Sequence, residues 1–221
     1  MKKIILFSLL FASFAMAPVK KHTILFFGDS ITQMGVNKGG YIDRIQTYLQ
    51  EKNLQNNYQL MGAGIGGNKV YDLYLRMEED VMDKNPNTVV IYVGINDVWH
   101  KTSGVGTDIA KYEKFYIAII KKLQAQKINV VLCTPTVIGE KKNNANAQDG
   151  DLNAYSDVVR KLAAAYQCKL VDLHAAFAAY ENANNTEDAE KGILTTDRVH
   201  LNDKGNQLVA DEMIKTLGLA Q

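Results

Sequence analysis

The 221-residue sequence is poor in several features that would place it in a specialised class of protein. It contains two cysteines, three prolines and one tryptophan, and its formal net charge is only +1. Two cysteines can form one bridge at most, so the fold cannot depend on a disulfide framework. The balanced charge gives no electrostatic attraction to nucleic acid or to an anionic membrane surface. We therefore expect neither as a partner.

Long hydrophobic runs are also missing, and the longest apolar segment lies at the start of the chain. Residues Ile4–Phe14 are apolar but too few to span a bilayer. Lys2 and Lys3 precede them, and Ala15-Met16-Ala17 follows as a small-residue cleavage site. The pattern predicts a signal peptide over residues 1–17 and export to the periplasm or the medium. A retained membrane anchor is the alternative, which the length and the flanking residues disfavour.

The two cysteines lie in apolar runs that we expect to form strands. Cys133 ends the run Ile128–Cys133, whereas Cys168 begins the run Cys168–Leu173. In neighbouring parallel strands these positions are at opposite ends, too far apart for a disulfide. We therefore expect two buried free thiols.

Strand-like and helix-like segments alternate along residues 18–221, which we expect to form a single domain. Short apolar runs that predict strands lie at His22–Phe27, Tyr58–Met61, Thr88–Val93, Ile128–Thr134 and Lys169–Leu173. Between and after them, apolar residues recur at spacings of three and four around residues 41–49, 70–81, 112–123, 152–162 and 208–217. This alternation predicts an α/β fold with a parallel sheet covered by helices on both faces. Sites in such sheets lie at the carboxyl ends of the strands.

One polar segment interrupts this pattern. Val137–Gly150 is rich in asparagine and follows the fourth predicted strand. It is long for a connection between a strand and a helix. Two interpretations stay open from the sequence alone, a binding loop or lid over the site and an ordinary solvated loop.

Residues with catalytic potential stand where three predicted strands end and before the last helix. Ser30 follows the first strand, a glycine-rich stretch at 62–68 follows the second, and Asn96 follows the third. Asp197 and His200 stand three residues apart just before the last helix. Acyl transfer needs a hydroxyl nucleophile, an imidazole base, an acid that orients the imidazole, and N–H donors for an oxyanion. The sequence supplies all of these groups.

In four blocks the chain resembles the SGNH hydrolases, also called GDSL esterases and lipases. The blocks are Gly28-Asp29-Ser30, Gly64-Ile65-Gly66-Gly67-Asn68, Gly94-Ile95-Asn96-Asp97 and Asp197-Arg198-Val199-His200. The resemblance implies a three-layer α/β/α sandwich with a five-stranded parallel sheet and a flavodoxin-like topology. It implies Ser30 as nucleophile, His200 as base and Asp197 as its partner. The implied oxyanion hole consists of the Ser30 N–H, the Gly67 N–H and the Asn96 side chain, without metal or cofactor.

The blocks depart from the family pattern at a few positions. Ile31 follows the serine where lipase-type members have leucine, and Gly62 and Asn68 replace Asn and Asp of many members. The second difference leaves Gly66 as an alternative to Gly67 in the oxyanion hole. We expect the remaining acids of the blocks, Asp29 and Asp97, to fix loops by accepting backbone N–H bonds.

Three other functions fit parts of the same pattern. The glycines at 62–67 match the dinucleotide-binding fingerprint, but the acidic residue expected about 20 positions later is missing. A divalent cation could bind to Asp29, Asp97, Asp197 and His200. Ser30 and Asn96 would then have no role. A non-catalytic carbohydrate-binding domain would not need the complete set of catalytic groups.

The prediction is therefore a secreted serine esterase that hydrolyses carboxylic esters through an acyl-enzyme. Export, the polar segment at 137–150 and the absence of a long apolar stretch favour short acyl groups, such as acetyl, on a saccharide. A lysophospholipase and an acyl-thioesterase are alternatives that the family resemblance allows. Trp99 and His100 follow Asn96 closely and either line the cleft or cover the surface beside it.

Overall fold

The computed structural model describes residues 21–219, so the expected signal peptide lies outside the described residues. Its sheet has five strands, β1 (His22–Gly28), β2 (Tyr58–Gly64), β3 (Thr88–Tyr92), β4 (Asn129–Cys133) and β5 (Lys169–Val171). The strands are parallel and lie in the order β2-β1-β3-β4-β5. This is the flavodoxin-like order, and the predicted five-stranded parallel sheet is confirmed.

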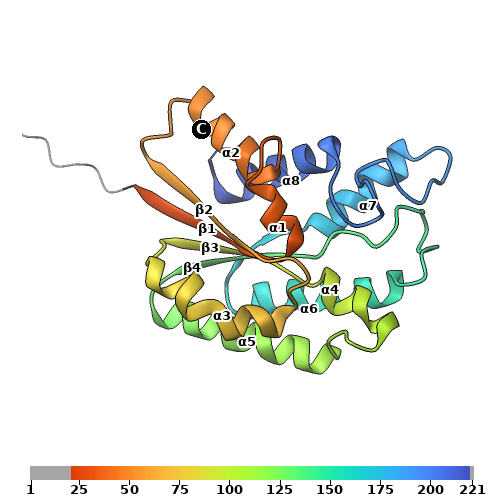
Figure 1. The fold of residues 1–221 in the computed structure, drawn as a ribbon, viewed down its shortest axis with the longest axis horizontal. Helices are drawn as coiled ribbons and strands as arrows, with labels where there is room; N and C mark the ends of the chain where they lie inside the picture. The colour runs from red at the N-terminus through yellow and green to blue at the C-terminus, as the bar shows by residue number, and fades with distance from the viewer. Residues whose placement is uncertain (1–20, 220–221) are drawn as a thin grey trace, which may run out of the picture.

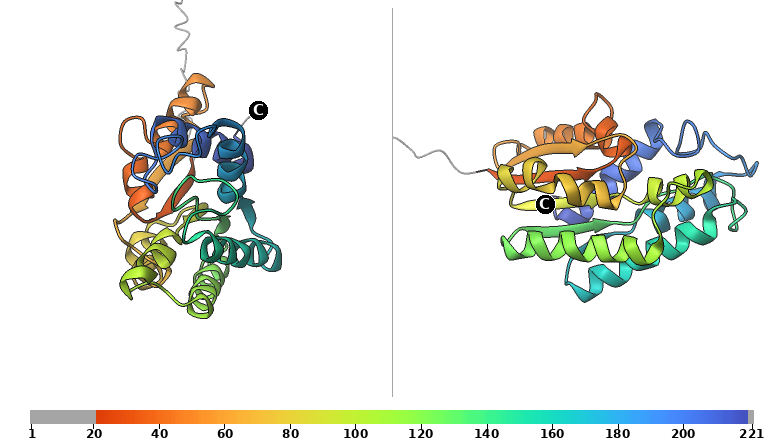
Figure 2. Two further views of the ribbon diagram at one scale, coloured as in Figure 1. Left: turned by 90° about the vertical axis from the view of Figure 1, so that its right-hand side faces the viewer. Right: turned by 60° about the horizontal axis from the view of Figure 1, so that its bottom comes forward.

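Helices cover both faces of the sheet and complete a three-layer sandwich (Figure 1). One layer contains α1 (Ser30–Gly35), α2 (Tyr41–Glu51), α7 (Leu173–Asn184) and α8 (Asp203–Leu217), and the other contains α3 (Val70–Asp80), α4 (Ile95–Trp99), α5 (Ile109–Ala125) and α6 (Asp149–Ala165). Two 3-10 turns at Met82–Lys84 and His100–Ser103 add to the second group. The layers are seen again from two other sides in Figure 2. Within residues 21–219, no helix has the length and apolar character needed to cross a membrane.

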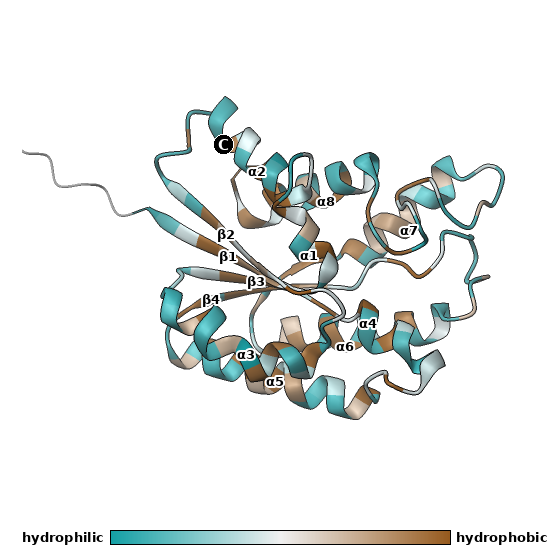
Figure 3. Ribbon diagram, in the orientation of Figure 1, coloured by the Kyte–Doolittle hydropathy of each residue, from teal (hydrophilic) through white to brown (hydrophobic). Residues whose placement is uncertain are grey.

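The core lies on both sides of the central strands. All five residues of β3 are buried, and the last five of β1 are buried too. A strand covered on both faces needs a nearly continuous apolar sequence, which is why these strands could be recognised as apolar runs. Hydrophobic residues follow the strands and hydrophilic residues face outward from the helices (Figure 3).

The carboxyl end of β1 lies at a switch point of the sheet. The neighbours of β1 are β2 on one side and β3 on the other, so the connections diverge there. Ligand sites of open α/β sheets lie at this kind of switch point. The strands approach closely where β1 ends: a Cβ on Gly28 would come within 2.3 Å of the Tyr92 carbonyl oxygen. Only glycine fits at that position.

Helix α7 begins where the apolar pattern predicted the end of a strand. The run Lys169–Leu173 was expected to be a strand, but β5 ends at Val171 and Leu173 begins α7. The Asp172 side chain accepts a hydrogen bond from the Ala175 N–H at 3.2 Å and caps the helix. A side-chain cap of this kind stabilises a helix start by about 1 kcal/mol.

The cysteines are free, as predicted, but only one is fully buried. Cys133 pairs with Val171 at the carboxyl end of the β4–β5 ladder, whereas Cys168 precedes Lys169 at its amino end. Cys133 is buried and Cys168 is half-buried. The expectation of two buried thiols is therefore wrong for Cys168, because β5 is the edge strand of the sheet.

The polar segment Val137–Gly150 has a buried beginning and an exposed tip. Val137, Ile138 and Glu140 are at most 5% exposed. Residues 143–145 are exposed, and α6 already begins at Asp149. A solvated loop is therefore the wrong interpretation for the first four residues of the segment.

Candidate active site

The carboxyl end of β1 places Ser30 at the switch point of the sheet. Asp29 precedes α1, and its side-chain Oδ1 accepts the Ile31 N–H at 3.0 Å. This contact confirms the loop-fixing role expected for Asp29. The carboxyl is only 2% exposed, and burial raises its pKa to about 7 although the Ile31 hydrogen bond opposes the shift.

The fold brings the distant residues Ser30, His200 and Asp197 into one chain of hydrogen bonds. The Ser30 hydroxyl lies 3.0 Å from His200 Nε2, and Asp197 Oδ2 lies 2.7 Å from His200 Nδ1. The arrangement fits a neutral imidazole that donates from Nδ1 to the carboxylate and accepts from the serine hydroxyl at Nε2.

The D-x-x-H spacing works because the aspartate also organises the turn. Asp197 Oδ1 accepts the backbone N–H groups of Val199 at 3.1 Å and His200 at 2.8 Å. Burial alone would raise the pKa of Asp197, but the hydrogen bonds from the His200 side chain and from both N–H groups bring it below its ordinary value. The carboxylate therefore stays charged opposite the imidazole at neutral pH.

Asn96 lies at the start of α4, at the carboxyl end of β3. It is 3% exposed, and its side-chain NH₂ donates to the Asn68 carbonyl oxygen at 3.1 Å. One of its two N–H bonds is thereby fixed in direction, which leaves the other for a ligand. The neighbouring Asp97 accepts the Val70 N–H with both carboxylate oxygens at 3.2 Å, which confirms its expected loop-fixing role.

The glycine-rich loop after β2 offers two backbone N–H groups that are not equivalent. The Gly66 N–H donates to the Gln33 side-chain oxygen at 2.9 Å. Gly67 has φ +76°, and a Cβ placed on it would meet no described heavy atom within 4 Å. The Gly66 N–H is engaged within the protein and Gly67 borders open space, so the geometry favours Gly67 over Gly66 as a donor to a ligand.

Arg76 on α3, which does not belong to the four sequence blocks, connects the segments around Ser30. Its guanidinium donates to the Gly28 and Ala63 carbonyl oxygens at 2.8 and 3.0 Å and to the Asn68 side chain at 2.7 Å. It also stacks 4.5 Å from the Phe27 ring centre. Its guanidinium also pairs with Asp80 at 2.6 Å, four residues further along α3. That spacing is visible in the sequence, but the contacts to the distant carbonyl groups of Gly28 and Ala63 leave no sequence signal.

Trp99 lies beside the imidazole of the site. Its ring meets the His200 ring edge to face, with 6.5 Å between the ring centres, and the centre of the His100 ring lies 5.8 Å from that of Trp99. Both Trp99 and His100 are half-buried. Burial, with a smaller effect of Lys69, lowers the pKa of His100. Trp99 thus forms part of the surroundings of His200.

The carboxylates proposed for a rival metal site are not gathered around one point. Asp29 accepts the Ile31 N–H of its own loop, Asp97 accepts the Val70 N–H at the start of α3, and Asp197 binds His200. Among residues 21–219, no group of three or more His, Cys, Asp or Glu side chains is placed to hold a metal ion.

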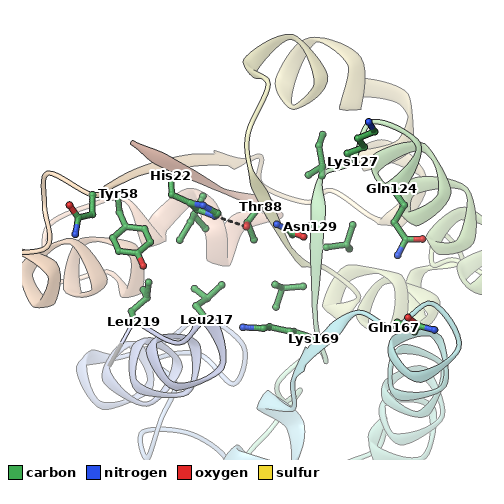
Figure 4. A pocket seen from close by; sticks show the side chains of 15 residues that line it. His22, Tyr58, Thr88, Gln124, Lys127, Asn129, Gln167, Lys169, Leu217 and Leu219 are labelled. Carbon is green, nitrogen blue, oxygen red and sulfur yellow. Dashed lines mark hydrogen bonds between the residues drawn. The ribbon is translucent and has the colours of Figure 1, made fainter. Parts of the chain in front are cut away.

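A separate groove of about 780 Å³ lies at the opposite edge of the sheet (Figure 4). Its lining includes the first residue of each strand, namely His22, Tyr58, Thr88, Asn129 and Lys169, with Leu217 and Leu219 across from them. Several of its polar groups have partners within the protein, such as His22 Nε2 with Thr88 Oγ1 at 2.9 Å. The groove lies at the amino ends of the strands, whereas Ser30 follows the carboxyl end of β1. It is therefore remote from Ser30 and does not belong to the catalytic arrangement.

The fold and the Ser–His–Asp arrangement are typical of serine hydrolases. The model of the GDSL-like lipase/acylhydrolase family matches residues 26–208. The chain belongs to this family and is a carboxylic ester hydrolase.

Two relatives illustrate what this chain is similar to. An acetylxylan esterase of Geobacillus stearothermophilus is 28% identical over 213 residues, which cover 88% of this chain and 93% of that protein. Two solved structures of Axe2, an acetylxylan esterase from Geobacillus stearothermophilus, are catalytic mutants, one at a serine and one at a histidine. They are 26% and 27% identical to this chain, with TM-scores of 0.79 and 0.78 over 91% of this chain and 97% of those chains. The acetyl xylan esterase AlAXEase, whose crystal structure is known, is 59% identical in sequence to this chain. The two structures match with a TM-score of 0.86 over 87% of this chain and 98% of that one.

Proposed function

We propose that this protein is an exported serine esterase that removes acetyl groups from a carbohydrate. The observation that carries the proposal is the hydrogen-bonded chain from Ser30 through His200 to Asp197. The acetylxylan esterases among its relatives support the saccharide as the alcohol part of the substrate. Export rests on the sequence pattern of residues 1–17.

In the first half-reaction, Ser30 attacks the acetyl carbonyl carbon while its proton passes to His200 Nε2. The carbonyl oxygen becomes negative, and we assign its stabilisation to the Ser30 N–H, the Gly67 N–H and the Asn96 side chain. Asp197 stabilises the imidazolium that forms. When the tetrahedral intermediate collapses, the ester C–O bond breaks and the sugar hydroxyl leaves with the proton from His200.

The second half-reaction regenerates the enzyme with the same groups. His200 takes a proton from a water molecule, whose oxygen attacks the acetyl-serine carbonyl. Collapse of the second intermediate breaks the serine ester bond, returns the proton to Ser30 Oγ and releases acetate. In this proposal the chain's own residues supply every proton transfer.

A short acyl group suits the environment of His200 better than a long one. Trp99 lies against the imidazole, and the groups described around Ser30 are polar backbone and amide groups. A long acyl chain needs an extended apolar surface for binding. The lysophospholipase and thioesterase alternatives therefore rank below a deacetylase.

The experiment that tests the proposal compares the parent protein with Ser30→Ala. Acetate release from acetylated xylo-oligosaccharides and hydrolysis of nitrophenyl esters of increasing chain length would be measured for both. We expect the parent to prefer acetyl esters and the variant, with an unchanged circular dichroism spectrum, to lose on the order of a millionfold in kcat. A variant that keeps more than a few per cent of the activity contradicts the serine mechanism. A parent that prefers long acyl chains contradicts the proposed substrate.

A further inference from the structure

Glu140 is a buried glutamate that touches none of the catalytic side chains. It is 0% exposed and lies in the buried part of the segment after β4. Its Oε2 accepts the Ile193 N–H at 2.8 Å, and its Oε1 accepts the N–H groups of Leu194 and Thr195 at 2.7 and 2.6 Å. One side chain thus binds three consecutive backbone donors.

These three donors belong to the segment that leads directly into the catalytic turn. Thr195 is two residues before Asp197, and its hydroxyl oxygen accepts the Arg198 N–H at 3.1 Å. Next to Glu140, the Gly139 N–H donates to the Arg198 carbonyl oxygen at 2.9 Å. The loop after β4 therefore binds both the segment before the D-x-x-H turn and Arg198 within the turn.

The turn has a backbone conformation that needs such support. Arg198, between Asp197 and His200, has φ +88°, a region that a residue with a side chain rarely adopts. Strained residues of this kind persist only where the surrounding structure fixes them. The contacts from Glu140, Gly139 and Thr195 supply that constraint.

Glu140 is itself held firmly in place. Its backbone N–H donates to the Glu190 carbonyl oxygen at 3.0 Å, and its carbonyl oxygen accepts the Asn185 side-chain N–H at 2.7 Å. Hydrogen bonds from backbone N–H groups to a carboxylate are among the stronger ones in proteins. The Glu140 backbone is thus bound to Asn185 after α7 and to Glu190, while its side chain binds residues 193–195 before the catalytic turn.

We propose that Glu140 is a positioning residue, which keeps Asp197 and His200 at hydrogen-bonding distance from Ser30. The inference rests on the proposed function, because it assigns the purpose of the anchor to the Ser30–His200–Asp197 chain. Glu140 acts through the backbone of residues 193–195 and does not take part in proton transfer.

Glu140→Gln tests this role because it keeps the shape but replaces one acceptor oxygen by an NH₂ that faces backbone N–H groups. We expect kcat on an acetyl ester to fall at least tenfold, with KM changed by less than about twofold, since small misplacements of catalytic groups are costly. The low-field proton NMR signal of His200 Nδ1–H should shift or broaden. Glu140→Asp, which keeps the carboxylate but shortens the side chain, should recover part of the lost kcat and keeps the test open if Glu140→Gln does not fold.

Glu181→Gln is the matched control, measured at pH 7. It replaces another buried glutamate on the neighbouring helix α7, and within residues 21–219 the Glu181 side chain makes no hydrogen bond to the catalytic turn. We expect it to leave kcat and the His200 signal unchanged. If Glu140→Gln lowers only the melting temperature and leaves both kcat and the His200 signal as in the parent, Glu140 is a stability residue and the inference is overturned. If the parent hydrolyses no ester, the proposed function fails. The comparison of the His200 Nδ1–H signal between parent and Glu140→Gln still decides whether Glu140 positions Asp197 and His200.

Discussion

At the scale of single residues, three aspartates of the family blocks have different roles because their surroundings differ. Asp29 and Asp97 are at most 2% exposed, and burial raises their pKa values to about 7 and about 6. Asp197 is half exposed and gains hydrogen bonds from His200, so its pKa falls below the ordinary value. Only Asp197 is therefore suited to balance a positive imidazolium.

The first prediction at this scale concerns Asn96. Asn96→Ala should lower kcat and kcat/KM together by roughly a hundredfold to a thousandfold, since an oxyanion donor acts mainly in the transition state. Activity should not vanish, because backbone donors remain. Steady-state kinetics on an acetyl ester would measure both constants. An increase of KM at unchanged kcat would instead make Asn96 a substrate-binding residue.

Asp97→Asn is the control for this variant. The carboxylate of Asp97 accepts the Val70 N–H with both oxygens and so holds the start of α3. Its replacement should reduce stability at least as much as catalysis. A melting curve and kinetics on the same preparation would separate the two effects.

At the scale of elements, α3 fixes the ends of β1 and β2 near Ser30. Arg76 reaches from this helix to Gly28 at the end of β1, to Ala63 in β2 and to Asn68 in the following loop. Asn68 in turn accepts the Asn96 side-chain N–H. The groups expected to bind the oxyanion are thus connected to one helix by a single side chain.

Arg76→Lys should therefore weaken both stability and catalysis. Lysine keeps the charge but cannot make the forked contacts to several carbonyl groups. We expect a loss of about 1.5–3 kcal/mol in the free energy of unfolding and a lower kcat, measured by denaturant unfolding and kinetics. Arg160→Lys is the control, since Arg160 pairs with Asp157 and Asp172 away from these strand ends. If both variants lose stability but neither loses kcat, α3 does not position the oxyanion donors.

The sequence allowed prediction of those elements and residues whose signal lies in their own side chains. The five strands are apolar runs, and the catalytic groups stand in recognisable blocks. Helix α7 was missed because its apolar start continues the run of β5, and the capping contact of Asp172 cannot be distinguished from a turn in the sequence. The roles of Glu140 and Arg76 depend on contacts with backbone atoms of distant segments, which any residue type could supply, so the sequence gives no signal for them.

At the scale of the whole molecule, buried acids make the stability of the fold depend on pH. Glu181 on α7 is 5% exposed, and within residues 21–219 its Oε1 atom has no hydrogen-bond partner. Burial, followed by repulsion from Glu140 and Asp149, raises its pKa from 4.5 to about 8. The folded protein therefore keeps a proton on Glu181 over a pH range in which the unfolded chain releases it.

The sign of the effect follows from this difference in bound protons. Between pH 4.5 and about pH 8 the folded state binds more protons than the unfolded state, so the free energy of unfolding falls as the pH rises. The Glu181→Gln variant has no titrating group at position 181, and its neutral amide resembles the protonated form of the Glu181 carboxyl group. The variant should match the parent near pH 4.5 and become the more stable protein at pH 8.5, by roughly a few kcal/mol.

Thermal unfolding of parent and variant from pH 4.5 to pH 8.5 would measure this difference. Subtracting the melting temperature of the parent from that of the variant at each pH removes the contributions of Asp29 and Asp97. Their raised pKa values act in the same direction in both proteins. We expect the gap in melting temperature to widen steadily with pH and to exceed about 5 °C at the alkaline end. Asn182→Asp, one position along α7 at an exposed site, controls for a general effect of charge on the helix. A gap that stays constant with pH would mean that Glu181 does not titrate between these limits in the folded protein.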